Sequence, residues 1–121
     1  MKLTELNHVA IRVADVERSC EFYASALRLE RLPRPAFDFP GAWFRLGAAQ
    51  ELHIIGGRDA PVVSHNRGNH FALRAENFEA WRTHLAGLNL IFHGPVKRPD
   101  GATQIFIRDP DGHTIELFTG P

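Results

Sequence analysis

The chain has 121 residues, of which 44% are hydrophobic, and its 14 basic and 14 acidic side chains give a formal net charge of zero. This size predicts one compact domain, and the balanced charge gives no electrostatic basis for binding nucleic acid. No apolar run approaches the roughly 20 residues that a membrane span requires. From the charge and the lack of such a run, we expect neither a nucleic acid nor a membrane as a partner.

The first predicted element is a strand near residues 5–13. His8, Ala10 and Arg12 alternate with large apolar residues, and successive side chains of a strand point to opposite faces. These three residues therefore share one face of the strand. The strand pattern follows the N-terminus directly, which leaves no room for a signal peptide.

A helix is expected to follow Asp15, whose carboxylate can cap the first free N–H groups. Val16, Cys20, Tyr23 and Leu27 recur at helical spacing and predict a buried stripe. Cys20 is expected to fill the core rather than act as a nucleophile. As the only cysteine, it excludes an internal disulfide, which is typical of a reducing, cytoplasmic setting.

Three further strands complete a first module, residues 1–57. Their predicted ranges are 30–37, 42–47 and 51–56. An irregular linker at 58–68 leads to a second module, residues 69–121, which shows the same order with a helix after Asn77. The strands of the second module are expected near residues 68–75, 90–97, 103–108 and 113–119.

The two modules repeat one short pattern. Residues 7–13 (NHVAIRV) recur as 69–75 (NHFALRA), and residues 51–57 align with 114–120. The repeat predicts an α+β fold of two βαβββ modules. Since a unit of about 60 residues buries too little surface to be stable alone, the modules should share one core in a single domain, residues 1–121.

The alignment of the last strands sets His53 opposite Glu116. Apolar neighbours flank both residues, so each polar side chain is expected to face away from the helices. Burying imidazoles and a carboxylate in a sheet costs several kcal/mol unless a partner satisfies them, and a divalent cation (Zn, Ni, Co, Fe or Mn) is the simplest partner. The predicted metal ligands are His8, His53, His70 and Glu116. Glu51, which shares the face of His53, is a rival ligand.

The other polar and aromatic candidates have alternative interpretations. Arg12 and Arg74 share a face with the strand histidines, and they either bind an anionic substrate or form ion pairs. Trp43, Phe39 and Phe106 either rim a pocket or pack in the core. The remaining histidines, which are expected to be solvated or structural, are His65, His84, His93 and His113.

Several motifs resemble the vicinal oxygen chelate superfamily of glyoxalase I, bleomycin resistance proteins and extradiol dioxygenases. They are residues 6–10 (LNHVA), 13–15 (VAD), 22–23 (FY), 27–29 (LRL), 69–72 (NHFA), 108–112 (RDPDG) and 115–117 (IEL). Residues 34–43, with Glu-Leu-His on the fourth strand, resemble a glyoxalase-like subgroup. The resemblance extends over essentially the whole chain and implies a U-shaped mixed sheet around a divalent metal, with the helices on its outer face. One departure is Arg28, which stands where the superfamily usually has glycine and is expected to cost about 1 kcal/mol.

The resemblance also implies metal ligands on the first and last strands of each module, the positions of the four predicted ligands. In fosfomycin-modifying and dioxygenase relatives only three positions bind, which correspond to His8, His70 and Glu116. Glyoxalase I-type enzymes carry a carboxylate in place of His53, so a two-glutamate proton shuttle is not expected. Small relatives are commonly homodimers that combine module 1 of one chain with module 2 of the other, so a homodimer is the expected assembly.

Three classes of function follow from the resemblance. The first is a metal-dependent lyase or isomerase of glyoxalase I type, with Glu116 as catalytic base, acting on a small substrate chelated through vicinal oxygens. The second is a ring-cleaving dioxygenase or a thiol transferase, and the third is a metal-free drug-binding resistance protein. Because His53 replaces a carboxylate, glyoxalase activity is expected to be weak or directed to another chelating substrate.

Overall fold

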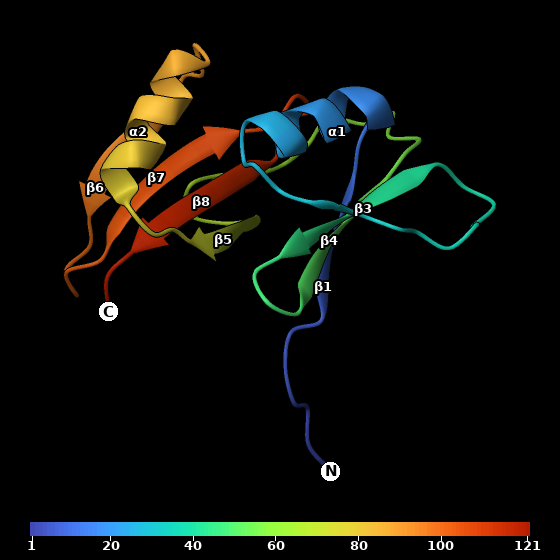
Figure 1. Ribbon diagram of the computed structural model, residues 1–121, viewed down its shortest axis with the longest axis horizontal. Coiled ribbons are helices and arrows are strands. Elements are labelled where there is room, and N and C mark those ends of the chain that lie inside the picture. The colour runs from blue at the N-terminus through green and yellow to red at the C-terminus, as the bar shows by residue number, and fades with distance from the viewer. The chain divides into compact units, whose positions relative to one another are not determined.

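Residues 1–60 and 61–121 form two units, each with one helix and one four-stranded mixed sheet, in the computed structural model, which describes all 121 residues (Figure 1). The first unit contains β1 (His8–Arg12), α1 (Val16–Ser25), β2 (Arg31–Leu32), β3 (Gly41–Leu46) and β4 (Gln50–Ile55). The second contains β5 (His70–Arg74), α2 (Phe78–Gly87), β6 (His93–Lys97), β7 (Thr103–Arg108) and β8 (Thr114–Thr119). This order confirms the α+β class and the two βαβββ modules. That the modules share one core in a single domain remains a prediction.

Proline accounts for the main difference from the expected strand boundaries. β2 has only two residues, whereas a strand was expected over 30–37. Pro33 and Pro35 follow it directly and have no N–H group to donate to a neighbouring strand. The division between the units falls after Ala60, inside the predicted linker. Neither helix is long and apolar enough to cross a membrane.

The strand order is the same in both sheets. The first sheet has the order β1-β4-β3-β2 and the second β5-β8-β7-β6, with a parallel pair at one edge and antiparallel pairs elsewhere. In the two parallel pairs, Ala10 lies opposite His53 and Ala72 lies opposite Glu116. His53 and Glu116 therefore occupy equivalent positions in the two sheets, in agreement with the alignment of their strands.

Buried apolar residues on one face of each sheet set the orientation of these polar residues. Leu52 and Ile54 are fully buried on either side of His53, and Ile115 is fully buried beside Glu116. Burial of apolar surface stabilises by about 25 cal/mol per Å², and a register shift of one residue would expose all of it. The hydrophobic core thus holds the imidazole and the carboxylate on the opposite face.

Both helices begin at the expected Asx residues. Asp15 accepts a hydrogen bond from the N–H of Arg18, and Asn77 accepts one from Ala80. Cys20 is buried in α1, which lies against β3 and β4. Burial raises the pKa of the Cys20 thiol, so little reactive thiolate forms near neutral pH. These features agree with a structural role for this cysteine.

Arg28 follows α1 with a φ angle of 55°, in the left-handed region. We expect Arg28→Gly to raise the free energy of unfolding by up to about 1 kcal/mol, because glycine adopts a positive φ without steric cost. Urea denaturation followed by circular dichroism measures the change. The matched control is Arg18→Gly, at an exposed position inside α1, which should lower stability by about 1 kcal/mol. A lower midpoint for Arg28→Gly would contradict the prediction.

Candidate metal centre

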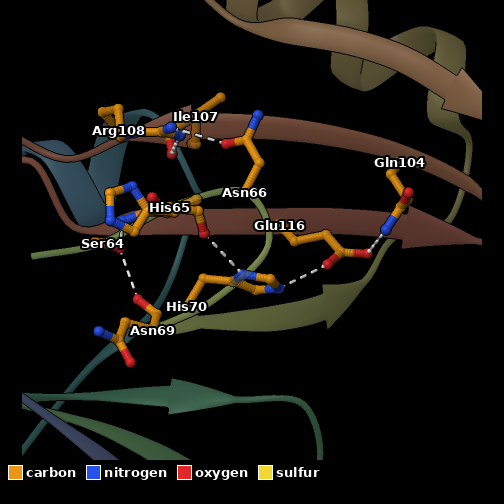
Figure 2. A network of polar contacts seen from close by, with 10 residues as sticks. Ser64, His65, Asn66, Asn69, His70, Gln104, Ile107, Arg108 and Glu116 are labelled. Carbon is orange, nitrogen blue, oxygen red and sulfur yellow. Dashed lines mark hydrogen bonds and ion pairs between the residues drawn. The ribbon is translucent and has the colours of Figure 1, made fainter.

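In the second unit, β5 and β8 bring His70 and Glu116 into direct contact. His70 Nε2 lies 3.0 Å from Glu116 Oε2, and the carboxylate is almost completely buried (Figure 2). Gln104 on β7 donates a hydrogen bond of 2.7 Å to the other carboxylate oxygen, Oε1. One oxygen of the Glu116 carboxylate is therefore held by the Gln104 amide, and the other faces the His70 imidazole.

A backbone carbonyl determines which nitrogen of His70 carries hydrogen. His70 Nδ1 lies 3.0 Å from the carbonyl oxygen of His65, and a carbonyl can only accept, so Nδ1 must be the donor. In a neutral ring the lone pair then lies on Nε2 and points at the Glu116 carboxylate. Two such acceptors at 3.0 Å attract each other only with a proton or a metal cation between them. This hydrogen-bonding pattern fits a metal ligand, since ligating histidines commonly donate their other N–H to a carbonyl or carboxylate.

In the first unit, the predicted ligands His8 and His53 stack on each other. Their ring centroids are 4.2 Å apart and the planes differ by 15°. The other face of His53 stacks on Trp43, at 4.1 Å and 4°. His8 Nδ1 also contacts the side-chain oxygen of Asn7 at 2.8 Å. The His53 ring is thus held between two other rings, which fixes its plane.

The rival ligand Glu51 lies beside the predicted ligand His53. Glu51 Oε1 is 2.9 Å from His53 Nε2, and both side chains are only partly exposed. A carboxylate can only accept a hydrogen bond, so this contact is a hydrogen bond in the tautomer of His53 that carries hydrogen on Nε2. His53 stands where glyoxalase I-type enzymes carry a carboxylate. The carboxylate of Glu51 lies on the same face of β4, in contact with His53.

Both strand arginines contact backbone carbonyls. Arg12 donates a hydrogen bond to the carbonyl of Gly57, and Arg74 donates one to the carbonyl of Gly120. The Arg74 guanidinium also lies 4.8 Å from the centre of the Phe118 ring. Each arginine thus fixes the chain just beyond the last strand of its unit. Binding of an anionic substrate by Arg12 or Arg74 stays a prediction.

The structure groups the four predicted ligands as two pairs, His8 with His53 and His70 with Glu116. No group of three or more His, Cys, Asp or Glu side chains is arranged to hold a metal ion. Sequence reasoning missed the amide of Gln104 and the carbonyl of His65. Gln104 could have been found from strand alternation, since it lies two residues before Phe106, the cross-strand partner of Glu116. The carbonyl carries no sequence signal because every residue has one.

Comparison with known proteins identifies the family. The model of the Glyoxalase/Bleomycin resistance protein/Dioxygenase superfamily matches residues 5–117. A lactoylglutathione lyase of Salmonella typhimurium is 36% identical over 124 residues, which covers 93% of this chain and 90% of that protein. The metallothiol transferase FosB of Staphylococcus saprophyticus is 28% identical over 123 residues, covering 98% of this chain and 78% of the transferase.

A solved structure shares the fold. The crystal structure of a putative glyoxalase family protein from Bacillus anthracis superposes with a TM-score of 0.87 at 22% identity, covering 100% of this chain and 98% of the other. The family match extends over nearly the whole chain, including His8, His53, His70 and Glu116. The chain belongs to the Glyoxalase/Bleomycin resistance protein/Dioxygenase superfamily.

Proposed function

We propose that this protein is a metal-dependent lyase or isomerase of glyoxalase I type, acting on a small substrate that chelates the metal through vicinal oxygens. The observation that carries the proposal is the contact between His70 Nε2 and Glu116 Oε2 at 3.0 Å. The His65 carbonyl already occupies the Nδ1–H of His70. The remaining nitrogen and the carboxylate oxygen form a pair of acceptors that a cation satisfies.

The metal ligands in this proposal are His8, His53, His70 and Glu116. Three imidazoles and one carboxylate suit a borderline divalent cation such as Zn, Ni, Co, Fe or Mn. When bound, such a cation acts as a Lewis acid that polarises a substrate oxygen and stabilises developing negative charge by several kcal/mol. Equivalent register of His53 and Glu116 in the two sheets supports the choice of His53 over Glu51.

Glu116 is the proposed catalytic base. Gln104 holds its Oε1, and Oε2, which would have to leave the metal for this step, takes the proton from a carbon next to a carbonyl. In a hemithioacetal this proton leaves the carbon that bears sulfur and hydroxyl and returns to the neighbouring carbon. One C–H bond breaks and one forms, and the hydroxyl proton moves to the former carbonyl oxygen, so the substrate is isomerised without net oxidation.

A thiol transferase is the second candidate function. The hydrogen bond from His53 Nε2 to Glu51 engages a nitrogen that a metal would otherwise use. A three-ligand site of His8, His70 and Glu116 would then remain, as the resemblance implies for fosfomycin-modifying relatives. The similarity to FosB metallothiol transferases supports this alternative.

Turnover of two substrates with defined metals tests both functions. Protein freed of metal by chelation is loaded with Zn²⁺, Ni²⁺, Co²⁺, Mn²⁺ or Fe²⁺, then given either a methylglyoxal–thiol hemithioacetal or an epoxide with a thiol. Formation of the hydroxyacyl thioester, lost again on chelation, is the expected result. Thiol addition to the epoxide alone would favour the transferase. No turnover of either substrate with any metal would contradict both proposals.

A homodimer is the proposed assembly. Light scattering during size-exclusion chromatography is expected to give a mass twice the 13.6 kDa of one chain. The expectation rests on the family, whose small members commonly form symmetric pairs, and closed twofold pairs are the commonest soluble oligomers. A monomer that binds metal at micromolar concentration would contradict it.

A further inference from the structure

The turn that precedes β5 contains the carbonyl that holds His70. The N–H of His65 donates to the carbonyl of Gly68 at 2.8 Å, and the N–H of Gly68 donates back to the carbonyl of His65 at 3.2 Å. The His65 carbonyl thus accepts two hydrogen bonds, one from Gly68 and one from His70 Nδ1. Both of its lone pairs are used, so the position of this carbonyl determines the position of the imidazole.

A single hydroxyl ties this turn to the strand that carries Glu116. Ser64 Oγ donates to the carbonyl of Asn69 at 2.6 Å (Figure 2). The same oxygen accepts the N–H of Thr114 at 2.8 Å. Asn69 immediately precedes His70 in the chain, and Thr114 lies two residues before Glu116 on β8. One side chain therefore links the backbone next to the imidazole with the backbone next to the carboxylate.

The surroundings leave no easy substitute for this hydroxyl. Thr114 is 1% exposed, and its N–H donates to Ser64 Oγ. Asn69 adopts a φ of 54° and its amide donates to the carbonyl of Val63 at 3.2 Å. Asparagine tolerates this left-handed conformation, and its backbone carbonyl accepts the hydrogen bond of Ser64 Oγ. Loss of the hydroxyl would release the turn from β8 and separate the His65 carbonyl from the imidazole.

We propose that Ser64 is a positioning residue for the pair of His70 and Glu116. Its hydroxyl keeps the His65 carbonyl against Nδ1 of His70, so that Nε2 of His70 faces Oε2 of Glu116 before any ligand arrives. The expected effect on metal affinity rests on the proposed function. The hydrogen bond from His70 Nδ1 to the His65 carbonyl does not depend on the proposed function, and it can be measured in the metal-free protein.

The test is the imidazole Nδ1–H signal of His70 in metal-free, ¹⁵N-labelled protein. A proton held by a carbonyl exchanges slowly with water, so wild-type protein is expected to show this resonance with contacts to the turn. Ser64→Ala should lose it through exchange, and Ser64→Thr, which keeps a hydroxyl, should restore it. Asn66→Ala is the matched control in the same turn, because Asn66 contacts Arg108 and neither Ser64 nor His70. Retention of the resonance in Ser64→Ala would overturn the proposal.

Metal affinity gives a second, separate readout. Competition titration with Zn²⁺ should show binding weakened by about 10-fold or more in Ser64→Ala, as for other supports of metal ligands, with Ser64→Thr close to wild type. If Ser64→Ala does not fold, Ser64→Cys, a weaker donor and acceptor, takes its place in both measurements. Wild-type zinc affinity in His70→Ala would refute the metal proposal, while the Nδ1–H signal would still decide the role of Ser64.

Discussion

Replacing Glu116 by glutamine is expected to weaken the binding of Zn²⁺ or Ni²⁺ by at least about 100-fold, because even groups that only support a metal ligand contribute 10- to 100-fold. The amide keeps the size of the carboxylate and an oxygen that can accept from Gln104, but it presents no negative charge to His70. Thermal unfolding measures the loss. At a metal concentration of 100 times Kd, wild-type protein should gain about 2.7 kcal/mol of stability, and the variant should gain almost none.

The control for this experiment is Glu79→Gln. Glu79 is an exposed glutamate on α2 that pairs with Arg82, so its replacement should leave stabilisation by metal unchanged. Hemithioacetal turnover should fall below detection in Glu116→Gln, since the same carboxylate is the proposed base. Wild-type metal affinity in Glu116→Gln would show that this carboxylate is not a ligand. Wild-type turnover would show that it is not the base.

Replacing His53 by alanine is expected to weaken metal binding by at least about 10-fold and to weaken the quenching of Trp43 fluorescence by metal to the same extent. The indole stacks on the imidazole at 4.1 Å, so Co²⁺ or Ni²⁺ held by His53 lies close enough to quench its emission. The chain has two tryptophans, and a Trp81→Phe background leaves Trp43 as the only one. Titration of this background variant with Co²⁺ should lower its emission, and with His53→Ala added the same decrease should require at least about 10-fold more Co²⁺.

Glu51→Gln in the same background separates the two rival ligands. If Glu51 only accepts the hydrogen bond of His53, its replacement should weaken binding less than His53→Ala does. His84→Ala is the control, because His84 lies on α2 and contacts the ring of Trp81, which is already absent. A larger loss for Glu51→Gln than for His53→Ala would make Glu51 the ligand and His53 its support.

The fold could be predicted from the sequence because its signals are local. Alternation of polar and apolar residues along His8–Arg12 and His70–Arg74 identifies strands, and capping residues such as Asp15 mark helix starts. The repeat then gives two modules of the same order, which the structure confirms. β2 was predicted too long because a hydrophobic pattern does not show which residues lack a backbone N–H. Pro33 has none and ends the strand.

The sequence by itself determined which polar side chains lie on the face of a strand opposite its apolar residues. Alternation along the strands gives His8, His53, His70 and Glu116, and the repeat aligns His53 with Glu116. Only the tertiary structure decided what each of these side chains contacts. Gln104 reaches Glu116 across an antiparallel pair, and the His65 carbonyl reaches His70 through a turn. Such contacts depend on strand register and on the course of a linker. Both are set by burial of the whole core and by backbone hydrogen bonds, neither of which a short sequence pattern contains.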